Sequence, residues 1–131
     1  MNAPLIEVSW GELFDKISIL EIKSARLTSE AALSNVRGEL ALLAAKTRMI
    51  RPHQPEIETL KAELKLVNET LWEIEDQIRE KEAVKEFDAT FIKLARSVYI
   101  QNDRRCAIKR AMNTLLLSDI VEEKSYKDYT S

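Results

Sequence analysis

The chain contains very little glycine. Only two of its 131 residues are glycine, and neither glycine nor proline occurs after Pro55. Loops that cradle phosphate need several glycines, and no glycine-rich loop, zinc-protease motif or nucleophile elbow is present. The single cysteine, Cys106, excludes an internal disulfide and cannot form a metal site alone. We therefore expect no cofactor, no metal site and no catalytic residue, and we favour a protein that is not an enzyme.

Long apolar runs are also missing. No stretch of about 18 apolar residues occurs, and the N-terminus, MNAPLIEVSW, lacks a basic region before an apolar run. The sequence thus predicts neither a membrane span nor a signal peptide, and a cytoplasmic protein without a membrane partner is expected. The formal net charge of −2 gives no global attraction to nucleic acid, so no nucleic-acid partner is expected.

What the sequence does have is helical periodicity. Charged residues make up 32% of the chain, which together with the scarce glycine favours an all-α protein. Apolar residues recur at alternating steps of three and four, as in a coiled-coil-like seam, at Ile57, Leu60, Leu64, Val67, Leu71, Ile74 and Ile78. Asp88 is predicted to cap a following helix, so the two helices form a long antiparallel hairpin. The alternative is one unbroken helix from Pro55 to Leu117, about 90 Å long, which buries its seam only against another chain.

Two shorter helices precede this hairpin. Ser9 and Glu12 have the spacing of a capping box, and Ser29 is a candidate cap for the second helix. We predict a single all-α domain over residues 1–121, a four-helix bundle-like fold in which a shorter N-terminal helical hairpin packs on the long one. The helices are expected at about 9–27, 30–49, 55–86 and 88–117. Residues 122–131 are predicted to form a polar, flexible tail, and His53 a solvated turn.

The apolar stripe of the last helix turns polar at Asn102 and Arg105. Together with the facing helix it predicts a candidate ligand groove, formed by Trp72, Glu75, Asp76, Arg79, Arg96, Tyr99, Asn102, Asp103, Arg105 and Lys109. Guanidinium groups bind phosphate or carboxylate and an aromatic ring supplies a face, so the groove suits an anionic, phosphate- or nucleotide-sugar-like ligand. The alternative, which we favour, is a buried polar network that fixes the register of the hairpin.

Two further groups of residues are given structural interpretations. The charged residues of the first helix are expected to lie on a solvated face: Asp15, Lys16, Glu21, Lys23 and Arg26. Cys106 is expected to be a small core residue.

Three strings carry a resemblance: EVSWGELFDKISILEIKSARL, LWEIEDQIREKEAVKEFDATFIKLARSVYIQNDRR and EEKSY. They resemble a bacterial family of small all-helical proteins of unknown function, over most of the chain apart from the loop around Pro52 and the last residues. Members of that family occur near glycosyltransferase and tetratricopeptide proteins linked to surface sugars. The resemblance implies at most a partner role in glycan or polysaccharide assembly, and it transfers no catalytic residue. The match at Glu122–Tyr126 also favours docking of the tail.

Two functional hypotheses follow. The first is a non-enzymatic helical interaction or assembly module, with a homodimer favoured and another protein as partner, because helices of unequal length leave part of the long hairpin uncovered. The alternative is a helical enzyme or small-molecule binder that recognises an anionic ligand in the groove. Changing Arg105 to Leu separates them, since the hairpin unfolds only if Arg105 pairs with a buried carboxylate.

Overall fold

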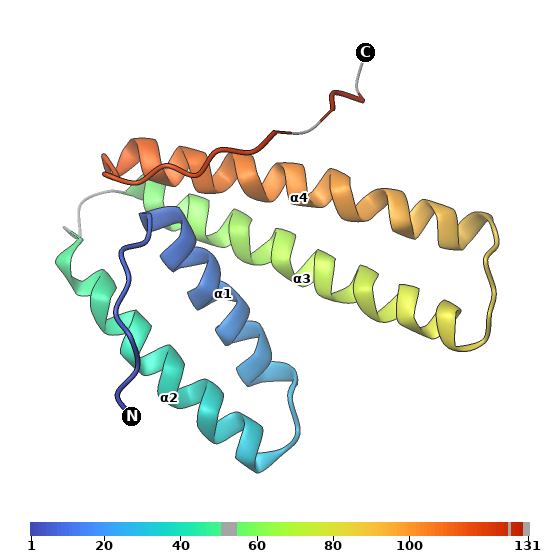
Figure 1. Cartoon of the computed structure of the whole chain (residues 1–131), viewed down its shortest axis with the longest axis horizontal. Coiled ribbons are helices and arrows are strands. Elements are labelled where there is room, and N and C mark those ends of the chain that lie inside the picture. Colours follow the sequence, from blue (N-terminus) through green and yellow to red (C-terminus); the bar gives the residue numbers. More distant parts are fainter. Residues whose placement is uncertain (51–54, 126, 130–131) are drawn as a thin grey trace.

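In a computed structural model the described residues of the chain form four α-helices and one short 3₁₀ helix (Figure 1). The structure describes residues 1–50, 55–125 and 127–129, so the predicted turn at His53 lies outside the described residues. The elements are α1 (Trp10–Arg26), α2 (Glu30–Lys46), η1 (Thr47–Met49), α3 (Pro55–Ala83) and α4 (Ala89–Leu115). These described ranges contain no strand, and the predicted all-α fold is confirmed.

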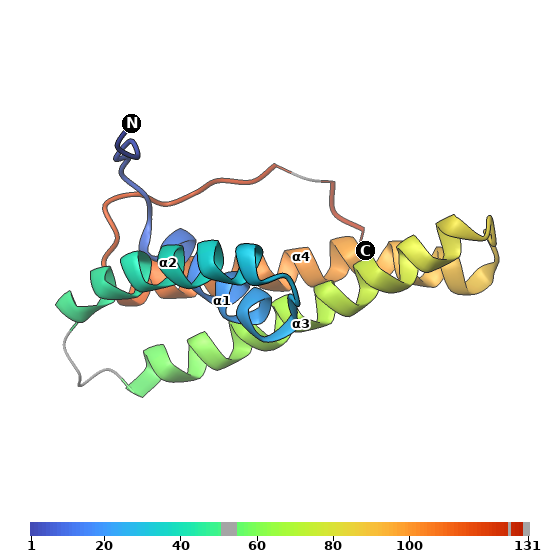
Figure 2. The same ribbon diagram turned by 90° about the horizontal axis from the view of Figure 1, so that it is seen from below.

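Helices α3 and α4 form the predicted antiparallel hairpin (Figures 1 and 2). The chain reverses between Ala83 and Ala89, so the alternative of one unbroken helix is wrong. Asp88 caps α4 as predicted, because its Oδ1 accepts a hydrogen bond of 2.9 Å from the backbone N–H of Phe91.

Both long helices end a few residues before the predicted ends at 86 and 117. Each ends in a hydrogen bond that closes the last turn, from Glu86 N to Lys81 O at 3.0 Å and from Ser118 N to Asn113 O at 2.8 Å. The residue before that donor has left-handed backbone, with φ of 57° at Lys85 and 51° at Leu117. Glycine usually occupies this position. Because the chain has no glycine there, each turn carries a cost of about 1 kcal/mol.

Helix α1 is the centre of the fold. It packs against α2, α3 and α4, whereas α2 packs only against α1 and the η1 turn among the described elements (Figure 2). The core cluster joins Phe14 of α1 to Ile57 and Leu64 of α3 and Met112 of α4. The shorter hairpin is therefore attached to the longer one through α1.

Helix α1 approaches α4 closely at Gly11. A Cβ atom at this position would lie 2.6 Å from the carbonyl oxygen of Lys109, and the Gly11 N–H donates a 2.7 Å hydrogen bond to Oδ1 of Asn113. The only other glycine, Gly38 in the middle of α2, has nothing within 4 Å of such a Cβ. One glycine is therefore required by packing and the other is not.

These two glycines give a matched pair of substitutions. Gly11→Ala should destabilise the fold by about 1–3 kcal/mol, because backbone must move to admit the methyl group. Gly38→Ala should stabilise it by up to about 1 kcal/mol, through helix propensity alone. Urea denaturation followed by circular dichroism measures both, and equal effects of the two substitutions would contradict the close contact at Gly11.

Candidate functional site

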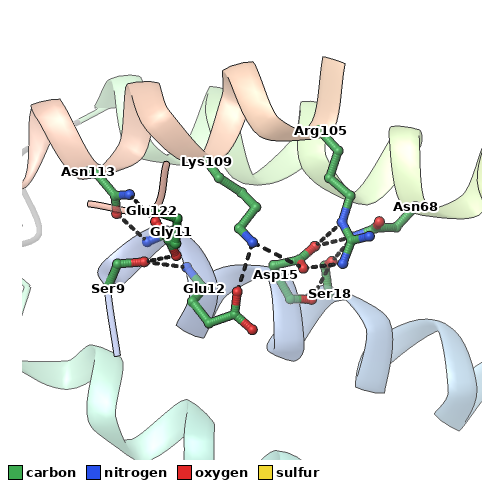
Figure 3. Close-up of polar contacts among 10 residues, drawn as sticks. All are labelled: Ser9, Gly11, Glu12, Asp15, Ser18, Asn68, Arg105, Lys109, Asn113 and Glu122. Atoms are coloured by element: carbon green, nitrogen blue, oxygen red, sulfur yellow. Dashed lines mark hydrogen bonds and ion pairs between the residues drawn. The ribbon is translucent and has the colours of Figure 1, made fainter. Parts of the chain in front are cut away.

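The polar site of the molecule is organised around Asp15 of α1, which is only 2% exposed (Figure 3). Arg105 of α4 binds this carboxylate in a bidentate manner: its Nε donates to Oδ1 at 2.9 Å and its Nη2 donates to Oδ2. Asn68 of α3 donates from Nδ2 to the same Oδ1 at 2.9 Å and to the Ser18 hydroxyl at 2.6 Å. One buried carboxylate thus joins three helices.

Lys109, one turn along α4 from Arg105, continues this network. Its Nζ lies 2.8 Å from Oε2 of Glu12 and 3.8 Å from Oδ2 of Asp15. Glu12 was predicted to complete a capping box with Ser9. The Ser9 hydroxyl does accept from the Glu12 N–H at 3.0 Å, but the Glu12 carboxylate turns to Lys109 instead of returning to the cap. The ionic partner on α4 replaces the second half of the box.

A third group of contacts holds the residues after α4 against the start of α1. Glu122 accepts a hydrogen bond from the hydroxyl of Ser9, and its Oε2 accepts from Nδ2 of Asn113 at 2.8 Å (Figure 3). Ser9 and Asn113 are 1% and 2% exposed. Glu122, the first residue of the predicted flexible tail, is thus bound to two buried side chains.

Most of the predicted groove residues are brought together. A groove of about 560 Å³ between α1, α3 and α4 is lined by Trp72, Glu75, Asp76, Arg79, Asn102 and Arg105. Asp103 and Lys109 line a different hollow, next to Glu122. Arg96 is exposed to solvent, and the ring of Tyr99 packs edge-on against Tyr129 with centroids 5.0 Å apart. The ten predicted residues therefore divide between the groove, the hollow and the surface.

The electrostatics of Arg105 and Lys109 are set by carboxylates of α1. Hydrogen bonding to Asp15 raises the pKa of the Arg105 guanidinium above its ordinary value, against the opposing effect of burial. Within the groove, Arg79 lies 3.8 Å from Glu75. Arg79, Arg105 and Lys109 are thus already paired, and an anionic ligand that binds them would have to displace a carboxylate of the chain.

Sequence reasoning missed the central residue of this site. Asp15 was expected on a solvated face, and this expectation is wrong, because Asp15 is buried and paired with Arg105. A signal was present: buried Gly11, Asp15, Ser18 and Ile22 recur at steps of four, three and four on α1. Small residues on both sides of a charged one mark a helix face that a neighbour approaches closely.

Residues 5–131 match DUF6165, which is described only as a family of unknown function. The chain belongs to this family. Membership of a family of unknown function was predicted, and DUF6165 confirms it. No curated protein and no solved structure matches the chain significantly. No helix among the described residues is long and apolar enough to cross a membrane.

The pairing of Asp15 with Arg105 yields a stability prediction. Arg105→Leu should destabilise the fold by about 3–5 kcal/mol, because it leaves a buried carboxylate with only the longer 3.8 Å contact to Lys109 as counter-charge. The double variant Asp15→Leu/Arg105→Leu should recover most of this loss, since no unpaired charge remains. Arg79→Leu in the same groove is the control and should change stability by less than about 0.5 kcal/mol. Urea denaturation measures all three, and a stable single variant would contradict a structural pair.

Glu122 gives a prediction about pH. Burial acts to raise the pKa of Glu122, but the hydrogen bonds from Ser9 and Asn113 and the charge of Lys109 hold this pKa below its ordinary value of 4.5. A lowered folded pKa means that the ionised group stabilises the fold above its unfolded pKa and that this stabilisation is lost in acid. The stability advantage of the wild type over Glu122→Gln should therefore shrink as the pH falls below about 5. Thermal denaturation from pH 7 to pH 3 measures it, and a constant difference would show that the carboxylate is not bound.

Proposed function

We propose that the chain is a non-enzymatic helical interaction module that forms a homodimer through the free end of its long hairpin. The observation that carries this proposal is the uncovered half of that hairpin: Figure 1 shows α3 and α4 continuing well past the end of α1. Among the described residues, the ion pair of α1 that lies farthest along α3 joins Arg26 to Glu73. Toward its turn, the hairpin continues beyond α1 as α3 and α4 alone (Figure 1).

Large apolar side chains are exposed where this free end turns. Val84, Phe87 and Ile92 retain 63%, 54% and 56% of their accessible surface. Phe87 packs edge-on against Phe91, with ring centroids 5.1 Å apart, so the aromatic pair is held in place. Contiguous exposed apolar surface with a polar rim is typical of protein–protein contact sites. A second hairpin end would bury these residues, and a closed pair with twofold symmetry is the commonest such assembly.

The polar site supports the same proposal. The polar groups at the centre bind one another: Arg105 pairs with Asp15, Lys109 pairs with Glu12, and Asn113 donates a hydrogen bond to Glu122. Such a network fixes how α1 lies on the hairpin and keeps the module rigid. The resemblance to proteins found near glycosyltransferases extends the proposal to a partner in surface-sugar assembly, which co-purification from a native host would test.

A second candidate function is a small-molecule binder, favoured by one observation. The groove of about 560 Å³ presents the ring of Trp72 beside Asn102 and Asp76. The guanidinium of Arg26 lies 5.9 Å from the centroid of that ring. A rise in melting temperature with one member of a panel of phosphates and nucleotide sugars, abolished by Trp72→Ala, would favour this candidate over the interaction module.

The dimer is tested at the hairpin end. Val84→Lys/Ile92→Lys leaves the contact between Phe87 and Phe91 in place and should weaken self-association at least about tenfold, because it buries two charges in the interface. Leu42→Lys on α2, where Leu42 is 70% exposed, is the control and should leave self-association unchanged. Absolute mass measured by light scattering over a dilution series reports the result. A wild-type monomer at every concentration, or equal weakening by both variants, would overturn the proposal.

A further inference from the structure

The segment after α4 runs back along that helix as a strap, here defined as the described residues 119–125 and 127–129 (Figures 1 and 2). Its contacts follow α4 in reverse order. Glu122 binds Asn113, Glu123 lies 2.9 Å from Arg110, Lys124 lies 3.3 Å from Asp103, and Tyr129 packs on Tyr99. The strap therefore lies antiparallel to α4 over several helical turns.

The strap leaves a hollow of about 410 Å³ between itself and α4. Cys106, Ala107 and Arg110 line this hollow from the helix, and Glu122 and Glu123 line it from the strap. Among the described residues, backbone-to-backbone hydrogen bonds that tie this part of the chain to the helices end at Ser118. The strap is thus held by its side chains, and its ion pair between Arg110 and Glu123 is largely solvent-exposed, with Glu123 retaining 78% of its side-chain surface. Exposed pairs of this kind contribute little.

Glu122 is the exception, because its carboxylate occupies a built site. The two groups that donate to it, the hydroxyl of Ser9 and the amide of Asn113, are almost completely buried. Ser9 is also the N-cap of α1, so the carboxylate lies at the positive end of a helix of 17 residues. If the strap lifts, these two buried donors lose their acceptor, which is costly unless another one replaces it.

We propose that Ser9 and Asn113 form a carboxylate-binding site for an extended acidic peptide of a partner, and that the strap is a built-in competitor that closes this site with Glu122. The residues beneath the strap extend the site, since Arg110 and Asp103 receive an acidic and then a basic residue in turn. A partner segment with two acidic residues followed by a basic one reproduces these contacts. This surface is separate from the free end of the hairpin and does not depend on the proposed dimer.

Opening of the strap can be followed with the natural thiol. Cys106 is the only cysteine in the chain and lines the hollow beneath the strap. Glu122→Ala should raise the rate at which a disulfide reagent labels Cys106 in the full-length protein by about tenfold, the effect of losing a hydrogen-bonded charge. Glu123→Ala, which removes only a surface pair, should raise it at most about twofold. Equal labelling rates in the wild type and both variants would overturn the proposal that Glu122 holds the strap closed over Cys106.

Binding of the acidic peptide is measured separately. The probe is a fluorescent synthetic peptide with the sequence of residues 119–129, and its control carries Glu122→Gln. A tethered segment competes at an effective concentration in the millimolar range, so the probe should bind the Glu122→Ala protein at least about tenfold more tightly than the wild type. The control peptide should bind neither protein. Equal binding of both peptides, or no binding to the open variant, would overturn the site.

Circular dichroism and the melting temperature show whether Glu122→Ala is folded. If it is not, Glu122→Gln replaces it, because glutamine keeps the size of the side chain while removing the charge that the Ser9 hydroxyl and the Asn113 amide bind. Fast labelling of Cys106 without any peptide binding would confirm a strap but reject the acidic partner. Both results leave the oligomeric state untouched, so they are distinguishable from a failure of the proposed dimer.

Discussion

Burial of the Asp15 carboxylate is the constraint on which the arrangement of the helices depends. A carboxylate removed from water loses several kcal/mol of solvation, and only a well-placed counter-charge with further hydrogen bonds compensates for it. Arg105 and Asn68 provide these from two other helices, so the pair forms only when α1 lies in one position on the hairpin. Apolar packing of Phe14 against Leu64 and Met112 favours contact between α1 and the hairpin, but apolar surfaces can also pack in shifted positions. The ion pair is what selects one register.

The sequence predicted the helices and their starts well, because these depend on local rules. Periodic apolar residues and the capping side chains of Ser9, Ser29 and Asp88 are visible within a few residues of each helix start. Helix ends were harder. The sequence offers no glycine to mark them, and the turns at Lys85 and Leu117 place ordinary side chains in left-handed backbone that no local signal announces. The predicted helices were therefore too long by a few residues.

The candidate site was predicted only in part, for a physical reason. A helical wheel shows which residues share a face of one helix, but not which other helix that face meets. The polar interruption at Asn102 and Arg105 was recognised, yet the partner of Arg105 was sought on α3, along the hairpin, when it lies on α1. Glu122 was beyond such reasoning altogether, because its acceptor role depends on Ser9, 113 residues away in the chain.

The buried polar groups also differ in how permanently their hydrogen-bond partners are held. In the interior, Asp15, Arg105 and Asn68 bind one another and leave little polar capacity for a ligand. At the start of α1, by contrast, the buried donors of Ser9 and Asn113 bind the carboxylate of Glu122, which belongs to the strap. These two donors keep this acceptor only while the strap remains in place. A buried group whose partner lies on the strap can exchange that partner without disturbing the core, because the strap is joined to the helices through side chains. The rigid network and the exchangeable contact are adjacent at the start of α1, at Glu12 and at the N-cap Ser9, so the core holds the proposed binding site in shape while its occupant can change.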